Sequence, residues 1–161
     1  MFVCHGNICR SPMAEFIFKK LLLDGKISSG FTVASSATST EEIYLGVGNP
    51  IYPPARRMLA EHGIPCSEKR AVLLENGDYD KYDMFIGMDR ANIRNMHRIF
   101  GGDPDGKIHL LMDFTSRTGE VADPWYTGGF ERAYLDIYEG CLCLFNKIVG
   151  DGKNDFRKTN T

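Results

Sequence analysis

Two kinds of hydrophobic pattern alternate along the chain: short continuous apolar runs, and longer segments whose apolar residues recur every three or four positions. The short runs predict strands at residues 2–3, 31–36, 84–88 and 108–112. The periodic segments predict helices at residues 12–24, 55–62, 93–100 and 130–148. Strands that alternate with helices in this way are typical of βαβ units, so we expect an α/β protein with a parallel sheet.

The organisation of the chain points to one domain. No internal repeat or low-complexity linker interrupts the pattern, and 161 residues suit a single hydrophobic core. We therefore expect one domain over residues 1–161, with a polar tail from about residue 151. A long loop rich in glycine and proline is expected at residues 38–54.

The composition excludes several classes of protein. A net charge of −2 gives no reason to expect a nucleic acid or an anionic membrane surface as partner, and no apolar run is long enough to span a bilayer. Five cysteines, an odd number, do not suggest a secreted disulfide framework, so we expect a reducing cytoplasm. The histidines lack the spacing of metal ligands, and we expect neither a metal nor another cofactor.

The segment between the first strand and the first helix carries residues suited to phosphate chemistry. Cys4 directly follows the predicted strand, Arg10 comes after it with five residues between them, and Ser11 is expected to stand just before the helix. A loop that curls into a helix start aims backbone N–H groups at one point, where they bind a tetrahedral oxyanion. We expect Gly6 to take backbone angles that other residues resist, and Asn7 to brace the loop.

Cys4 and Arg10 are predicted to act together on this oxyanion. The planar guanidinium of Arg10 can hold two phosphate oxygens, and the positive field of the loop favours the thiolate of Cys4. A thiolate placed there is a nucleophile toward phosphorus. Ser11 is expected to cap the helix or to donate a hydrogen bond to the sulfur.

With these residues the chain resembles the low-molecular-weight protein tyrosine phosphatase family. The resemblance implies a flavodoxin-like three-layer sandwich, with a four-stranded parallel sheet of order 2-1-3-4 flanked by helices. It implies hydrolysis of protein phosphotyrosine and small aryl phosphates through a phosphocysteine intermediate, without a metal. The phosphate would be bound by the loop residues His5, Gly6, Asn7, Ile8, Cys9 and Ser11. The matching motifs lie at residues 3–15, 35–39, 48–50, 62–64, 88–89 and 123–126.

A general acid must come from outside the loop, because the loop holds no carboxylate. Asp123 precedes Pro124, which stiffens the backbone, and two aromatic residues follow. The resemblance gives Asp123 two roles, as acid toward the tyrosine leaving oxygen and then as base toward water. Trp125 and Tyr126 would wall the entrance and stack on the substrate ring. Such a deep slot selects phosphotyrosine over the shorter phosphoserine.

Other proteins share this loop, and a few residues separate them. Protein-arginine phosphatases that resemble this chain carry Thr at the position of Ile8, so Ile8 favours phosphotyrosine. Thiol-dependent arsenate reductases carry Ser there and need two further cysteines in a redox segment. Here Cys141 and Cys143 fall within a helical pattern and Cys66 stands alone. A non-catalytic oxyanion-binding protein would have no use for Asp123 in its aromatic setting.

The resemblance carries further expectations. Cys9 would form a reversible disulfide with Cys4 under oxidation, although a simply packed thiol is the alternative. Family members often place an aromatic residue opposite the Trp125 wall, and Tyr44 is the candidate here. Asp89 is expected to brace nearby loops. The expected partners are phosphotyrosine-containing proteins or peptides, with inorganic phosphate or sulfate as loop ligands, and the expected state is a monomer or weak homodimer.

Overall fold

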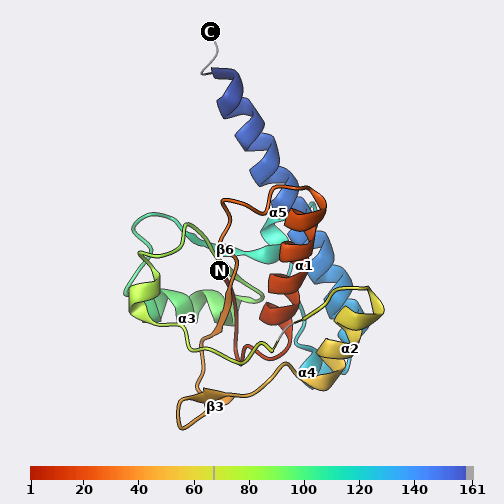
Figure 1. The fold of residues 1–161 in the computed structure, drawn as a ribbon. Helices are drawn as coiled ribbons and strands as arrows, with labels where there is room; N and C mark the ends of the chain where they lie inside the picture. The colour runs from red at the N-terminus through yellow and green to blue at the C-terminus, as the bar shows by residue number, and fades with distance from the viewer. Residues whose placement is uncertain (67, 159–161) are drawn as a thin grey trace.

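The central feature of the computed structural model is a wholly parallel four-stranded sheet in the order β2-β1-β5-β6 (Figure 1). The structure describes the backbone of residues 1–66 and 68–158, and the side chains of residues 1–66 and 68–150. Numbered by chain order within this sheet, the strands follow the expected order 2-1-3-4. The elements are β1 (Phe2–Cys4), α1 (Arg10–Asp24), β2 (Ser35–Ala37), β3 (Ile43–Tyr44), β4 (Val47–Gly48), α2 (Pro53–Glu61), the 3-10 helix η1 (Asn76–Asp78), β5 (Phe85–Gly87), α3 (Arg90–Phe100), β6 (Ile108–Leu110), the 3-10 helix η2 (Leu111–Phe114), α4 (Pro124–Thr127) and α5 (Phe130–Lys158).

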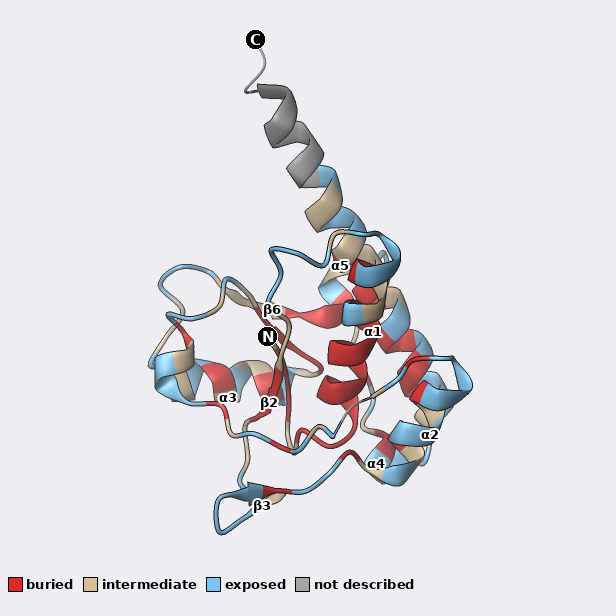
Figure 2. Ribbon diagram, viewed as in Figure 1, coloured by how far each residue is buried: buried red, intermediate tan, exposed pale blue. Residues whose placement is uncertain are grey.

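Helices cover both faces of the sheet. Successive strand residues point to opposite sides, and the apolar residues on each side pack against a layer of helices. Phe2 and Cys4 pack with residues of α1, α2 and α5, whereas Val3 packs with residues of α3. In β5 the same alternation sends Ile86 to the first layer and Phe85 to the second. Figure 2 shows buried residues along the strands and on the inner side of α1. The expected three-layer sandwich is therefore confirmed.

Burial and one close approach tie the last helix to this core. Ile17 of α1 and Ile137 of α5 are fully buried in the same layer, and burying a side chain of this size stabilises the fold by about 1.5–3 kcal/mol. Gly140 lies inside α5 where a helix would favour alanine. A Cβ atom at this position would lie 2.5 Å from Cγ of Leu111, so glycine is required for α5 to approach η2.

Some strand and helix bounds differ from the sequence-based ones, for identifiable reasons. The second strand was expected at residues 31–36 but is only Ser35–Ala37. The neighbouring strand β1 is itself short, and its residues pair with β2 only from Phe2↔Ser35 to Cys4↔Ala37. Phe31 is instead 38% exposed. The run at residues 108–112 continues from β6 into a 3-10 helix, a distinction that a continuous apolar run does not encode.

The long loop at residues 38–54 contains an unexpected antiparallel hairpin, β3-β4. Its two turn residues, Leu45 and Gly46, have φ angles of 47° and 79°, which are typical of tight hairpin turns. The hairpin projects from the end of the sheet near the β1–α1 loop (Figure 1). It therefore places the preceding residues of the loop beside that segment.

The polar tail expected from about residue 151 continues the backbone of α5 as far as Lys158, and residues 159–161 lie outside the described part of the chain. None of the helices in the described residues combines the length and the apolar character needed to cross a membrane.

Candidate active site

The segment from Cys4 to Arg10 lies at the carboxyl end of the sheet, where open α/β sheets usually bind ligands. Cys4 is the last residue of β1 and Arg10 is the first residue of α1, and both side chains are buried. The loop surrounds a narrow cavity of about 60 Å³. The cavity is lined by Cys4, His5, Gly6, Asn7, Ile8, Cys9, Arg10, Glu41, Glu42, Asp123, Trp125 and Tyr126.

Ser11 supports the sulfur of Cys4 rather than capping the helix. The helix begins one residue earlier, with Cys9 at the cap position and no side-chain cap bond. The Oγ of Ser11 lies 3.0 Å from Sγ of Cys4, and the backbone N–H of Ser11 reaches the same sulfur at 3.5 Å. Asn7 Nδ2 donates to Ser11 Oγ at 2.8 Å, so the hydroxyl hydrogen of Ser11 is free to point at the sulfur. Two donors from Ser11 thus converge on the sulfur of Cys4.

Asn7 braces the loop, as expected, but mainly through bonds to distant side chains and backbone. Its φ angle is 57°, a left-handed conformation, and its side chain is 1% exposed. Besides Ser11, it donates to Ser35 Oγ at 2.8 Å and accepts from Val72 N at 3.0 Å. The prediction for Gly6 is wrong, because its φ is not positive. Gly6 instead gives room, since a Cβ there would lie 3.0 Å from the side chain of Glu42.

A buried carboxylate completes this polar network and was missed by sequence reasoning. Glu15, on the buried side of α1, accepts from Ser35 Oγ at 2.6 Å. Lys69 lies 3.4 Å from Glu15 Oε2 and donates to the backbone oxygen of Ser35 at 2.8 Å. Hydrogen bonds thus run from Glu15 through Ser35 and Asn7 to the loop. A charged residue among the apolar positions of a helix face was the available signal.

Arg10 is held by carboxylates from two other loops. Its Nη1 donates to Asp89 Oδ2 at 2.7 Å and to the carbonyl oxygen of Val121 at 2.9 Å, and its Nη2 donates to Asp123 Oδ2 at 3.0 Å. Burial by itself lowers the pKa of Arg10, but the neighbouring sulfur and the two carboxylates raise it above its ordinary value. Arg10 therefore stays cationic. Asp89, which was expected to brace nearby loops, does so through its bond to Arg10.

Asp123 and the two aromatic residues after it stand at the mouth of the cavity. Asp123 Oδ1 accepts from the backbone N–H of Trp125 at 3.1 Å and so caps the short helix α4. Trp125 is 52% exposed and Tyr126 is 82% exposed. The Trp125 ring packs against Tyr52, with the ring centroids 4.8 Å apart. Trp125 is therefore held in place by packing, whereas the side chain of Tyr126 is largely exposed to solvent.

The opposite wall differs from the expected one. Tyr44 lies on the β3-β4 hairpin, is 78% exposed and does not line the cavity, so the prediction for it is wrong. The hairpin carries this side chain away from the loop, and Glu41 and Glu42 line the cavity instead. Glu41 Oε2 lies 2.9 Å from Nε2 of His5, which forms an exposed ion pair when the histidine is protonated.

The remaining cysteines divide between loop and core. Burial raises the pKa of Cys9 to about 12, with further contributions from the charges of Cys4 and Asp123, so Cys9 is a neutral thiol at neutral pH. Burial also raises the pKa of Cys141, which packs against α1 with its sulfur 3.7 Å from Ala14 O. All five cysteines are unpaired. Across the described ranges, no group of three or more histidine, cysteine or carboxylate side chains is placed to hold a metal.

Comparison with known proteins agrees with this geometry. The family model "Low molecular weight phosphotyrosine protein phosphatase" matches residues 1–154. A low molecular weight protein-tyrosine-phosphatase of Staphylococcus saprophyticus, PtpA, is 36% identical over 151 residues, 93% of each chain. YfkJ of Bacillus subtilis, named as the same kind of enzyme, is 36% identical over 154 residues, which cover 92% of this chain and 94% of YfkJ.

Solved structures of such proteins share the fold. The crystal structure of YfkJ has a TM-score of 0.85 at 32% identity and covers 93% of each chain. SP-PTP from Streptococcus pyogenes has a TM-score of 0.79 at 36% identity, over 91% of this chain and 89% of that one. Because the family model covers nearly the whole chain and the relatives match it in sequence and in fold, the chain belongs to the low molecular weight phosphotyrosine protein phosphatase family.

Proposed function

We propose that this protein hydrolyses protein phosphotyrosine and small aryl phosphates through a phosphocysteine intermediate. One observation carries the proposal: the sulfur of Cys4 has two donors from Ser11 and opens into the same narrow cavity as Arg10 and Asp123. A thiolate, a fixed cation and a carboxylate around one cavity are the groups that transfer of a phosphoryl group to sulfur requires.

The first step forms a sulfur–phosphorus bond and breaks the bond between phosphorus and the phenolic oxygen. Cys4 attacks as the thiolate, while Arg10 and the loop amides, including those of His5, Gly6, Ile8 and Cys9, hold the three other phosphate oxygens. These contacts are strongest in the transition state, where the oxygens carry the most charge. Asp123, protonated at this stage, donates its proton to the leaving phenolate.

The second step regenerates the enzyme. Water attacks phosphorus, the sulfur–phosphorus bond breaks, and Asp123 takes the proton from the water. In the structure Asp123 Oδ2 accepts from Arg10 Nη2 at 3.0 Å. Phosphate oxygens would replace this carboxylate at Arg10, so binding of the substrate frees Asp123 to act on the leaving oxygen.

The walls of the cavity support phosphotyrosine as the substrate. Trp125, packed against Tyr52, and Tyr126 offer aromatic surface at the mouth for a substrate ring. A phosphoserine is too short to reach the loop past these residues. Ile8 is an apolar side chain where an arginine phosphatase would carry a hydroxyl, and it lines the cavity.

The proposal extends to redox protection and to partners. Cys9 lines the same cavity as Cys4, which supports a reversible disulfide between them under oxidation. Free inorganic phosphate or sulfate is expected to bind the loop, and the protein is expected to act as a monomer or weak homodimer. The five unpaired cysteines support a reducing compartment such as the cytoplasm.

A matched turnover assay tests the substrate. Peptides that differ only in carrying phosphotyrosine, phosphoarginine or phosphoserine are compared in the presence of a chelator and a thiol reductant. We expect efficient turnover of the phosphotyrosine peptide alone. Turnover of phosphoarginine would refute the discriminating role of Ile8 and favour an arginine phosphatase. Tight phosphate binding without turnover of any peptide would favour a non-catalytic oxyanion-binding protein or a reductase.

A further inference from the structure

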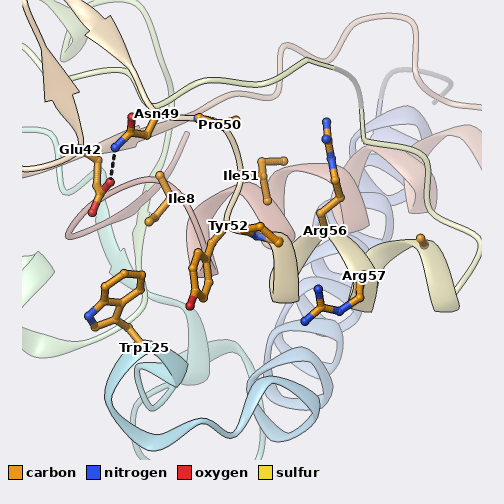
Figure 3. A pocket seen from close by; sticks show the side chains of 11 residues that line it. Ile8, Glu42, Asn49, Pro50, Ile51, Tyr52, Arg56, Arg57 and Trp125 are labelled. Atoms are coloured by element: carbon orange, nitrogen blue, oxygen red, sulfur yellow. Dashed lines mark hydrogen bonds between the residues drawn. The ribbon is translucent and has the colours of Figure 1, made fainter.

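A second, larger cavity adjoins the active-site cavity. Its volume is about 540 Å³, which is within the range of pockets that bind peptides and small molecules. The two cavities share Ile8, Glu42 and Trp125 in their linings. Figure 3 shows Ile8 and Trp125 at one end of this groove and the side chains of Arg56 and Arg57, from α2, at the other. A ligand that leaves the active site along this side enters the groove.

The groove is firmly attached to the loop that holds the phosphate. The backbone N–H of Tyr52 donates to the carbonyl oxygen of Ile8 at 2.8 Å, which fixes the position of the groove relative to the loop. The Tyr52 ring packs against both Trp125 and Phe130, with centroid distances of 4.8 and 5.9 Å. Ile51, another lining residue, is 3% exposed. The part of the groove wall formed by Ile51 and Tyr52 is therefore apolar and held in place by packing.

The far end of the groove is cationic. Arg56 and Arg57 are both exposed, and α2 has no acidic residue in its first turn to offset the positive end of the helix dipole. Among the side chains that the structure describes, the arginines that form ion pairs are Arg10, Arg90, Arg117 and Arg132. The guanidinium groups of Arg56 and Arg57 thus have no carboxylate partner within the described residues.

The near end carries the opposite charge. Glu42 lines both cavities, and its Oε2 accepts from Asn49 Nδ2 at 2.7 Å, as the dashed line in Figure 3 marks. Glu41 lies beside it, paired with His5. The charge along the groove therefore changes from negative beside the active site to positive at Arg56 and Arg57. A ligand with a carboxylate next to the phosphotyrosine is repelled, and one with a carboxylate further away is attracted.

We propose that this groove binds the substrate peptide beside the phosphotyrosine and selects for an acidic residue a few positions away, which Arg56 and Arg57 recognise. The inference rests on the proposed function and specifies its substrate class. An apolar side chain between the phosphotyrosine and the acidic residue fits the wall of Ile51 and Tyr52. Both cations are solvent-exposed, so the selection is modest and falls as salt is added.

The test measures a ratio of kcat/KM values. Phosphotyrosine peptides carry Glu or Gln two to five residues from the phosphotyrosine, in one series toward each end of the peptide. In one series we expect the Glu peptide to be preferred by about three- to tenfold at low salt, as exposed ion pairs allow, with the preference declining at high salt. The ratio cancels any effect of a variant on the chemical step.

Two double variants localise the effect. R56Q/R57Q should reduce the preference to about one, because both cations that attract the Glu side chain are removed. The two are replaced together because a single exposed ion pair contributes only modestly. R94Q/R98Q removes the same charge from two exposed residues of α3, on the other side of the molecule from α2 in Figure 1, and should retain the preference.

The outcomes separate this inference from the function on which it rests. Equal kcat/KM for Glu and Gln peptides in both series of the unaltered protein would overturn the inference while leaving the phosphatase in place. An equal loss of preference in R56Q/R57Q and R94Q/R98Q would overturn the assignment to the groove, because net charge would then be the cause. Absence of turnover for every phosphotyrosine peptide and for p-nitrophenyl phosphate would overturn both.

Discussion

Replacement of Asn7 by alanine removes the side chain that braces the loop between Cys4 and Arg10. The side chain is 1% exposed and makes three hydrogen bonds, to Ser11 Oγ, Ser35 Oγ and Val72 N. Each such bond contributes about 0.5–1.5 kcal/mol to stability. Alanine would also have to adopt a φ angle of 57°, at a cost of about 1 kcal/mol.

Together these terms predict that Asn7→Ala lowers the free energy of unfolding by about 3–5 kcal/mol. In urea the midpoint should fall by roughly 2 M. Turnover should fall as well, by about tenfold or more, because Ser11 would no longer be held with its hydroxyl toward the sulfur. Asn95→Ala is the matched control, since Asn95 lies half-exposed on α3, and this change should alter stability by no more than about 0.5 kcal/mol.

Urea unfolding followed by circular dichroism, together with kcat for an aryl phosphate below the transition, measures both effects. A loss of less than about 1 kcal/mol would refute the assigned hydrogen bonds. A large loss of stability with unchanged kcat would show that Asn7 holds the fold without orienting the site.

Four other experiments test separate parts of the site. Asp123→Asn should slow a poor aryl leaving group by about 10²-fold or more and a good one much less; equal losses would remove Asp123 from the acid role. Because burial raises the pKa of Cys9 to about 12 and keeps it protonated at neutral pH, iodoacetamide at neutral pH should label Cys4 before Cys9; labelling of Cys9 ahead of Cys4 would contradict this. Peroxide-treated Cys9→Ser should recover poorly with reductant, whereas recovery equal to that of the unaltered protein would leave Cys9 as packing. Tyr44→Ala should leave kcat/KM for p-nitrophenyl phosphate within about twofold, since exposed side chains away from a site contribute little, and a large loss would mean that the hairpin closes over the substrate.

The parts of the site that the sequence could predict are those governed by local chain geometry. A cysteine at the end of a strand and an arginine at the start of a helix necessarily face the same loop, so Cys4 and Arg10 were identifiable. The order of the sheet followed from the family resemblance and is confirmed. A bracing role for Asp89 in nearby loops also followed from the family resemblance, but its partner Arg10 was found only in the structure.

The parts that could not be predicted depend on contacts between distant segments. Glu15 stands out in sequence as a charged residue among apolar positions, but its partners Ser35 and Lys69 lie far along the chain and could not be identified from it. The β3-β4 hairpin lacks the Asn-Gly or Asp-Gly turn by which such hairpins are recognised in a sequence. Because the hairpin projects away from the loop, Glu41 and Glu42 line the cavity and Tyr44 does not. The periodicity of apolar residues predicts helices and strands but does not predict which distant side chains come into contact.

The measurement that tests the central claim most directly is mass analysis of the protein quenched in acid during turnover of a phosphotyrosine peptide. The account predicts one added phosphoryl group on the fragment that contains Cys4, which appears with phosphotyrosine, disappears when substrate is exhausted, and is absent in Cys4→Ser. Turnover at a normal rate by Cys4→Ser, or a phosphoryl group on any other residue, would contradict it.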